Sequence, residues 1–274
     1  MDPRNYQIAV LCAFVALGRA WLDFDFTATI AAAVVVTAVL CQWVLFGCQL
    51  KSALISSLSL VLLLRTDTIW LAMLAAVIAI VSKKYLTIRH RHVFNPSALA
   101  LVVVTMLFNG AWLAPGQWGP MGLSALLLAG AGLLVVTRAQ RLDVALAFLL
   151  TFSSIVVLRG VWLGDPSAIA MHALQNGALI VFAFFMITDP KTTPSTMQLR
   201  VLHGVSVAVL AAMLQFQFYV SSAPLFALVI LSPVVALFLY SKETAHEKTS
   251  VHTHIADRFA TDRAGYRILR ILRR

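Results

Sequence analysis

The chain has 274 residues, of which 61% are hydrophobic and only 12% are charged, and its formal net charge is +10. A soluble domain is about 25% charged, so this composition excludes a soluble enzyme, because too few charged residues are present to cover a water-exposed surface. The basic residues lie between apolar runs and in the C-terminal tail, and not in one groove-like patch. We therefore expect no nucleic-acid partner and expect contact with membrane lipid instead.

Ten apolar runs follow one another along the chain, and each is a candidate helix. A membrane-spanning helix needs about 20 mostly apolar residues, or fewer when it is broken or re-entrant. The runs are 6–22, 27–47, 52–64, 69–82, 96–113, 120–137, 142–163, 168–187, 201–220 and 223–241. The sequence therefore predicts an all-α, polytopic membrane helix bundle of about ten transmembrane helices over residues 1–242. A basic cytoplasmic tail is predicted over residues 243–274.

The third and fourth runs are short, and they flank a charged break at residues 65–68. Such a break is typical of half-helices that line a site, and equally of an ordinary tight loop at the membrane edge. The segments at 18–22 and 159–163 are loosely similar. This similarity suggests two inverted repeats with short broken helices, an arrangement that places a site at the repeat interface.

Lysine and arginine are divided unevenly between the two ends of the predicted helices. Of the 21 such residues, only Arg19, Arg65 and Arg159 lie at connections after odd-numbered runs. We expect the chain to lie in the inner (plasma) membrane of the cell. The positive-inside rule then places both of its termini in the cytoplasm. The end of the tail, residues 262–274, alternates basic and apolar residues, which suits either an amphipathic helix on the inner leaflet or a disordered basic tail.

The first polar stretch with a candidate site spans residues 83–97 and contains Phe94-Asn95-Pro96-Ser97. A residue before proline favours extended geometry, and proline suits the first turn of a helix. Asn95 or Ser97 could bind a ligand near that helix start, where the helix dipole favours an anion such as a phosphate. A capped helix start beside a basic loop explains the same pattern.

The second polar stretch, residues 184–195, places Asp189 directly after a fully apolar run. An ionised residue at that depth is costly unless it is paired or solvated, so Asp189 is expected to pair with Lys191 or with a basic residue of the first stretch. An Asp-Pro turn at the water interface is the alternative. We further expect Asn95 and Asp189 to approach each other and to frame one polar pocket that suits an anionic or flavin-like ligand.

Other chemical sites are not indicated by the sequence. Cys12, Cys41 and Cys48 form no CxxC motif, and no metal site is expected. His172 and His203 fall near opposite ends of their predicted helices, which argues against a haem held by two histidines. Sequence signatures of a hydrolase triad or a phosphate-binding loop are missing, so catalytic residues stay unassigned.

These stretches resemble the RnfD/NqrB family, the large membrane subunits of the Rnf and sodium-pumping quinone oxidoreductase complexes. The resemblance covers most of residues 2–200, and it is carried by residues 51–56, by Phe-Asn-Pro at 94–96 and by Phe-Phe-Met-Ile-Thr-Asp-Pro at 184–190. Residues 2–4 and 115–119 are similar to the small stand-alone members, which include enediyne-biosynthesis-type proteins.

The resemblance implies a ten-helix fold that binds a flavin, either FMN or riboflavin, and passes electrons together with other membrane or soluble redox subunits. It points to Asn95, Pro96, Thr188, Asp189 and Lys191 as the residues that bind the cofactor. It also implies a subunit of a membrane oxidoreductase of the translocase type, in which electron transfer is coupled to a membrane process.

One departure from the family concerns the attachment of the flavin. Electron-transferring members carry a Ser-Gly-Ala-Thr segment whose threonine holds FMN through a phosphoester. No such segment occurs between the two polar stretches, and the loop 109–119 contains no threonine. We therefore expect a flavin that is bound non-covalently. The alternatives are a transporter or exporter, or a membrane anchor, on the same scaffold and without redox activity.

Overall fold

The computed structural model describes residues 2–89, 91–113, 130, 132, 137, 140–174 and 176–241. The predicted tail 243–274, the segment 115–119 and, apart from three isolated residues, the predicted helix 120–137 lie outside this part of the chain. The chain divides into two compact units, Met1–Pro233 and Val234–Arg274. Every residue of the site described below belongs to the first unit.

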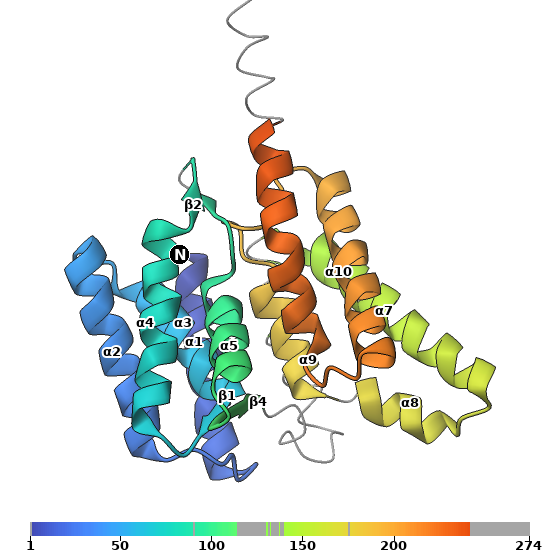
Figure 1. Ribbon diagram of the computed structural model, residues 1–274, viewed down its shortest axis with the longest axis horizontal. Helices are drawn as coiled ribbons and strands as arrows, with labels where there is room; N and C mark the ends of the chain where they lie inside the picture. Colours follow the sequence, from blue (N-terminus) through green and yellow to red (C-terminus); the bar gives the residue numbers. More distant parts are fainter. Residues whose placement is uncertain are drawn as a thin grey trace, which may run out of the picture. The chain divides into compact units, whose positions relative to one another are not determined.

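The first half of that unit is built from five helices (Figure 1). They are α1 (Pro3–Ala20), α2 (Ala28–Phe46), α3 (Leu50–Leu63), α4 (Ile69–Tyr85) and α5 (Pro96–Leu107). Helix α3 contacts α1, α2, α4 and α5, and most of its side chains are buried. Helix α4 presents a series of buried alanines, Ala72, Ala75, Ala76 and Ala79. Small residues of this kind let neighbouring helix backbones approach closely, as α4 does against α2 and α5.

The charged break between α3 and α4 begins with two buried residues, Arg65 and Thr66, and continues with the exposed Asp67. Strand β1 (Leu64–Thr66) pairs antiparallel with β4 (Ala111–Leu113), so the predicted helix 96–113 ends early, at Leu107. The Arg65 side chain is 1% exposed, and its guanidinium donates hydrogen bonds to the carbonyls of Val61, Leu62 and Leu64 at 3.0, 3.2 and 2.8 Å. The arginine thus satisfies carbonyls at the end of α3 that have no partner within the helix.

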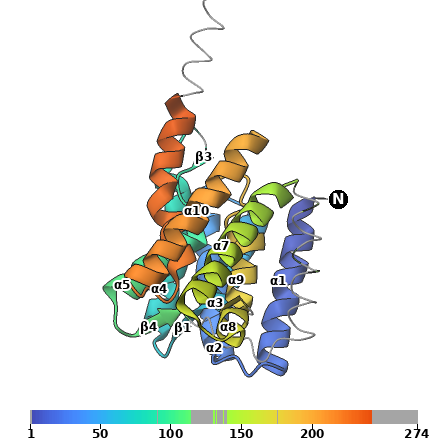
Figure 2. The ribbon, with the colours of Figure 1, turned by 90° about the vertical axis from the view of Figure 1, so that its right-hand side faces the viewer.

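The second half contains α7 (Leu142–Leu163), α8 (Ser167–Leu174), α9 (Gly177–Val181), the π-helix η1 (Phe182–Met186) and α10 (Met197–Gln217). Helices α7 and α10 lie side by side (Figure 1, Figure 2). Gly204 makes their close approach feasible, because a Cβ atom there would lie 2.7 Å from the Val144 carbonyl oxygen.

The prediction of one helix over residues 168–187 is wrong in one respect, because the structure forms two helices there with a bend between them. Helix α8 and the segment Gly177–Met186 are bent by 49° relative to each other. The side chain of Asn176 accepts a hydrogen bond from the Ala178 amide and so starts a new helix. The final turn of the second piece then widens into η1.

Four helices of the described residues are long and apolar enough to cross a membrane: α2, α7, α10 and Ala223–Ser241. The bent pair of α8 and Gly177–Met186 would make a fifth span, and α3 and α5 are shorter apolar helices. The structure therefore supports a mostly helical membrane protein, with two short strand pairs added to the helices. It does not confirm about ten transmembrane helices or two inverted repeats, because several of the apolar helices are shorter than a bilayer requires. The orientation of the termini stays a prediction.

Candidate functional site

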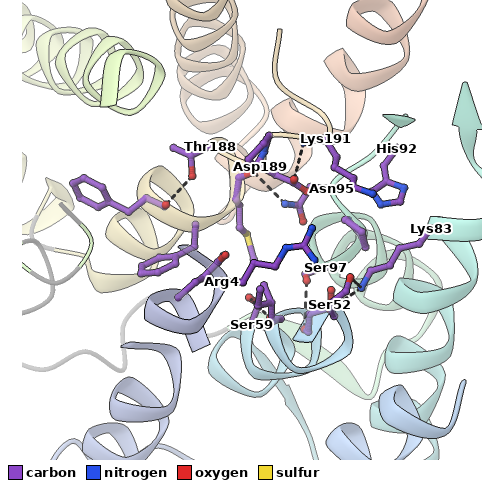
Figure 3. A pocket seen from close by; sticks show the side chains of 18 of the residues that line it. Arg4, Ser52, Ser59, Lys83, His92, Asn95, Ser97, Thr188, Asp189 and Lys191 are labelled. Atoms are coloured by element: carbon purple, nitrogen blue, oxygen red, sulfur yellow. Dashed lines mark hydrogen bonds between the residues drawn. The ribbon is translucent and has the colours of Figure 1, made fainter. Parts of the chain in front are cut away.

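A cavity of about 680 Å³ lies among the start of α1, helices α3 and α5, and the segment that follows η1 (Figure 3). All five residues that the sequence indicated line it: Asn95, Pro96, Thr188, Asp189 and Lys191. Small-molecule sites in proteins typically measure about 300–1,000 Å³, so the volume suits an organic cofactor. The structure thus brings the two polar stretches of the sequence to the same place.

Asn95 links these two stretches directly. Its Oδ1 accepts a hydrogen bond from the Ala98 amide at 3.1 Å and so caps the start of α5. Its Nδ2 donates to the carbonyl oxygen of Met186, the last residue of η1, at 3.1 Å. The side chain is almost fully buried, at 6% exposed. Asn95 is therefore a helix cap, as one interpretation of the sequence held, and it also joins the two sides of the cavity.

The second stretch is organised around the end of η1. In that helix the amide of Ile187 donates to the Phe182 carbonyl at 3.1 Å, one residue further back than in an α-helix. The hydroxyl of Thr188 donates to the Phe184 carbonyl at 2.7 Å, and the hydroxyl of Thr193 donates to the Ile187 carbonyl at 3.0 Å. Threonine hydroxyls thus satisfy carbonyls that the wide turn exposes.

Asp189 follows this helix end and contacts Lys191 through the backbone. Its Oδ1 accepts a hydrogen bond from the Lys191 amide at 3.0 Å, which is an Asx-turn. Among the residues that the structure describes, no lysine or arginine side chain lies within 4.0 Å of the Asp189 carboxylate. Within the described part of the chain, Asp189 therefore does not form the expected ion pair, and the Asx-turn agrees with the alternative interpretation of this segment as a turn.

A short hairpin covers the same region, and the sequence did not single it out. Strands β2 (Thr87–Ile88) and β3 (Arg91–His92) pair between α4 and α5. Arg91 Nη2 donates to the carbonyls of Thr193 and Pro190 at 2.9 and 3.4 Å. Arg91 therefore ties the hairpin to the loop that carries Asp189. Only the high density of basic residues in the stretch 83–97 could have pointed to such a role.

The cavity also has a polar wall that sequence reasoning missed. Ser52, Ser56 and Ser59 occupy one face of α3, where their spacing of four and three residues was the available signal. Lys83 is 5% exposed, and its ammonium donates to the Ser52 carbonyl and hydroxyl at 2.8 and 3.0 Å. Arg4 reaches into the cavity from the start of α1 (Figure 3).

Two titratable groups near the rim have shifted pKa values. Burial lowers the pKa of His92, with opposition from the Asp189 carboxylate, so the imidazole is neutral near pH 7. Its Nδ1 is buried without a hydrogen-bond partner in the described part of the chain. The Arg4 amide and then Lys51 lower the pKa of Asp2 by donating hydrogen bonds to its carboxylate.

The lining combines apolar side chains with hydrogen-bonding and charged groups. Within the described ranges, no group of three or more His, Cys, Asp or Glu residues could hold a metal ion. Phe184, Phe185 and Met186 provide apolar surface, whereas the serines, Asn95 and the cationic side chains provide hydrogen-bond groups. Such a combination binds an organic molecule that has an apolar body and polar edges.

Comparison with known proteins gives the family. Residues 111–245 match the NQR2, RnfD, RnfE family, a region that contains the motif at 184–190. The RnfD subunit of the ion-translocating oxidoreductase complex of Escherichia coli O1:K1 is 33% identical over 110 residues, which is 39% of this chain and 26% of that protein. The corresponding protein of Salmonella paratyphi B is 32% identical over 107 residues, or 38% and 29% of the two chains.

The matched part thus corresponds to about a quarter of the length of these relatives. It overlaps the range 2–200 over which the resemblance was expected and continues beyond it to residue 245. The similarity to the small stand-alone members stays a prediction. As its sequence motifs predicted, this membrane protein is related to the NQR2, RnfD, RnfE family, whose model it matches over residues 111–245.

Proposed function

We propose that this chain is an integral membrane component of an ion-translocating electron-transport system, and that it binds FMN or riboflavin non-covalently in the cavity between Asn95 and Asp189. The observation that carries the proposal is the convergence of the two polar motifs on one cavity of suitable volume. The relatives, whose names describe a subunit of an ion-translocating oxidoreductase complex, support the electron-transport role.

The residues of the cavity fit a flavin in three respects. Phe184 and Phe185 offer an apolar surface to a planar ring, and the hydroxyl groups on α3 offer hydrogen bonds to its polar edge. Lys83 and Lys191 place positive charge at the lining, and positive charge near a flavin is one means by which a protein tunes its electronics. A bound flavin would supply one- and two-electron transfer, which no side chain at this site supplies.

The proposal includes the cellular setting. The cavity lies at the end of the helices where basic residues are frequent: Lys51 is in the first turn of α3, Lys83 and Lys84 are in the last turn of α4, and Arg91 is in the hairpin that follows α4. The positive-inside rule assigns such an end to the cytoplasmic side of the inner membrane. Electrons would then pass between the cavity and other membrane or soluble redox subunits, which we propose as partners because the relatives are subunits of a complex.

The test is the flavin content of the purified full-length protein in detergent. We expect a flavin absorbance spectrum, and we expect denaturation to release all of the flavin, so that the protein band on an SDS gel is not fluorescent. Fluorescence that survives SDS would contradict non-covalent binding. Protein that lacks flavin and binds neither added FMN nor added riboflavin would overturn the proposal, and substrate uptake into vesicles without any redox change would instead support the transporter alternative.

A matched pair of variants locates the binding. Asp189→Asn changes the charge at the cavity lining, and Asp67→Asn changes an exposed aspartate that does not line it. We expect the first variant to lose flavin during purification and the second to keep it. Equal retention in both would place the flavin elsewhere in the chain.

A further inference from the structure

Lys83 is a buried basic residue at the cavity wall that makes no direct ion pair within the described part of the chain. It belongs to the last turn of α4 and is 5% exposed. Both of its hydrogen bonds go to neutral oxygens of Ser52. In the portion of the chain that the structure describes, no carboxylate lies within 4.0 Å of its ammonium nitrogen. An ammonium group carries three donors, so one N–H is left for a ligand, and a buried charge is costly until an anion neutralises it.

The start of α5 lies beside this ammonium group. The Ser97 hydroxyl donates to the Ser56 carbonyl at 3.3 Å, while Lys83 bonds to Ser52. Residues four apart on a helix are neighbours with Cβ atoms about 5–6 Å apart, so Lys83 and the first turn of α5 contact adjacent turns of α3. Helix α5 has twelve residues, and its N-terminus adds a positive dipole end. Pro96 has no N–H, and the amides of Ala98 and Leu99 bond to the side chain and the carbonyl of Asn95, so the Ser97 amide is the first-turn N–H left for a ligand among the described contacts.

The remaining charges of the lining are also positive on balance. The lining contains three cationic residues, Arg4, Lys83 and Lys191, and two acidic residues, Asp2 and Asp189. The two carboxylates already accept hydrogen bonds, from Lys51 and from the Lys191 amide respectively. The cavity therefore has an excess of positive charge, and the buried part of that excess is the ammonium group of Lys83.

We propose that Lys83, together with Ser52 and the N-terminus of α5, forms an anion subsite that takes a phosphate monoester, so that the cavity prefers a phosphorylated ligand to its unphosphorylated counterpart. This inference refines the proposed function, because FMN carries a phosphate monoester and riboflavin does not. The subsite itself rests only on the burial and contacts of Lys83.

The experiment is a pair of equilibrium titrations of the full-length protein in detergent, with FMN and with riboflavin. One charge-assisted contact at a buried site changes affinity on the order of tenfold to a hundredfold, and we expect FMN to bind more tightly than riboflavin by that factor. Lys83→Met should abolish the difference between FMN and riboflavin, and Lys83→Arg should keep most of it. Equal affinities in the wild type would overturn the subsite.

Lys84→Met is the matched control. Lys84 is the next residue of the same helix, but it is exposed, its ammonium bonds only to the Leu45 carbonyl at 3.4 Å, and it does not line the cavity. We expect this variant to keep the preference for FMN. If the control loses the preference as Lys83→Met does, general surface charge explains the binding and the subsite is refuted. Should Lys83→Met fail to fold, Lys83→Gln replaces it in the same comparison.

Two further measurements distinguish anion binding at the subsite from binding of the flavin itself. Inorganic phosphate should raise the unfolding temperature of the wild type, but not of Lys83→Met, relative to chloride at the same ionic strength. If phosphate stabilises the wild type while neither flavin binds, the subsite stands and the proposed function fails. If FMN and riboflavin bind with equal affinity, the proposed function stands and the subsite fails. The second measurement compares vesicles of phosphatidylglycerol with vesicles of phosphatidylcholine. If phosphatidylglycerol stabilises the wild type but not Lys83→Met, and FMN has no effect, the subsite binds a lipid headgroup and the preference for a monoester is overturned.

Discussion

Replacement of Asn95 should destabilise the protein by more than the loss of an ordinary helix cap. Asn95→Ala removes the acceptor for the Ala98 amide and the donor to the Met186 carbonyl. Loss of an N-cap costs about 1 kcal/mol, and a buried carbonyl left without its partner costs about 1–3 kcal/mol. The Met186 carbonyl keeps a long bond of 3.4 Å from the Asp189 amide, which limits the second contribution. The two terms together amount to about 2–4 kcal/mol.

Two other variants separate the cap from the link between the motifs. Asn95→Ser keeps an oxygen that can cap α5 but lacks the amide nitrogen that donates to the Met186 carbonyl. It should therefore lose only the contribution of the bond to Met186. Thr27→Ala is the control for a cap alone. The Thr27 hydroxyl accepts from the Ile30 amide at 3.2 Å at the start of α2, in an exposed position. Its loss should cost about 1 kcal/mol.

The assay is reversible unfolding of the detergent-solubilised protein, followed by circular dichroism across a denaturant titration. The expected order of destabilisation is Asn95→Ala, then Asn95→Ser, then Thr27→Ala. If Asn95→Ala costs no more than Thr27→Ala, the bond to Met186 contributes nothing to stability. The two motifs would then be independent helix ends that merely lie close together.

Three further predictions concern the site and its orientation. Asp189→Asn should weaken flavin retention with little loss of folded protein, and its combination with Asn95→Ala should be less than additive in a binding assay; independent effects would refute a shared pocket. Because burial lowers the pKa of His92, the unfolded chain takes up a proton near pH 6.5 before the folded protein does, so stability should fall as pH drops below about 6.5, and His92→Gln should flatten that slope in thermal unfolding. Reporter fusions after Ser221 and after Lys242 should report the outside and the inside of the cell respectively, whereas an external signal after Lys242 would reverse the predicted topology.

The positions of the helices could be predicted because each is an apolar run that ends at a polar or proline-containing segment. The start of α5 at Pro96 and the bounds of α7, Leu142–Leu163, follow the predicted ranges closely. The number of membrane spans could not be predicted in the same way. Hydropathy reports that a segment is buried, but it does not distinguish burial in lipid from burial among other helices, and the short helix α3 is of the second kind.

The sequence predicted the two motifs that meet at the candidate site, but it did not predict the polar wall that the α3 serines and Lys83 form. Asn95 and Asp189 were visible because each precedes a proline at a point where a polar, basic segment meets an apolar run. Lys83 was considered only as one of several basic residues that could pair with Asp189, because a lysine in the last turn of a helix is otherwise expected simply to complement the helix dipole. Only the tertiary contact with Ser52, thirty-one residues earlier in the chain, shows that this lysine is buried at a cavity.

The irregular backbone around the cavity explains why a polar site can exist in so apolar a chain. A helix end exposes N–H or C=O groups that lack partners, and in an apolar environment these groups must find other ones. Here a helix start, at Pro96, meets a helix end, at Met186, and the Asn95 side chain bonds to both. The widened turn of η1 adds to these groups, because it exposes carbonyls that the hydroxyls of Thr188 and Thr193 satisfy. The helix start at Pro96 and the helix end at Met186 thus supply the backbone polar groups around which this side of the cavity is built.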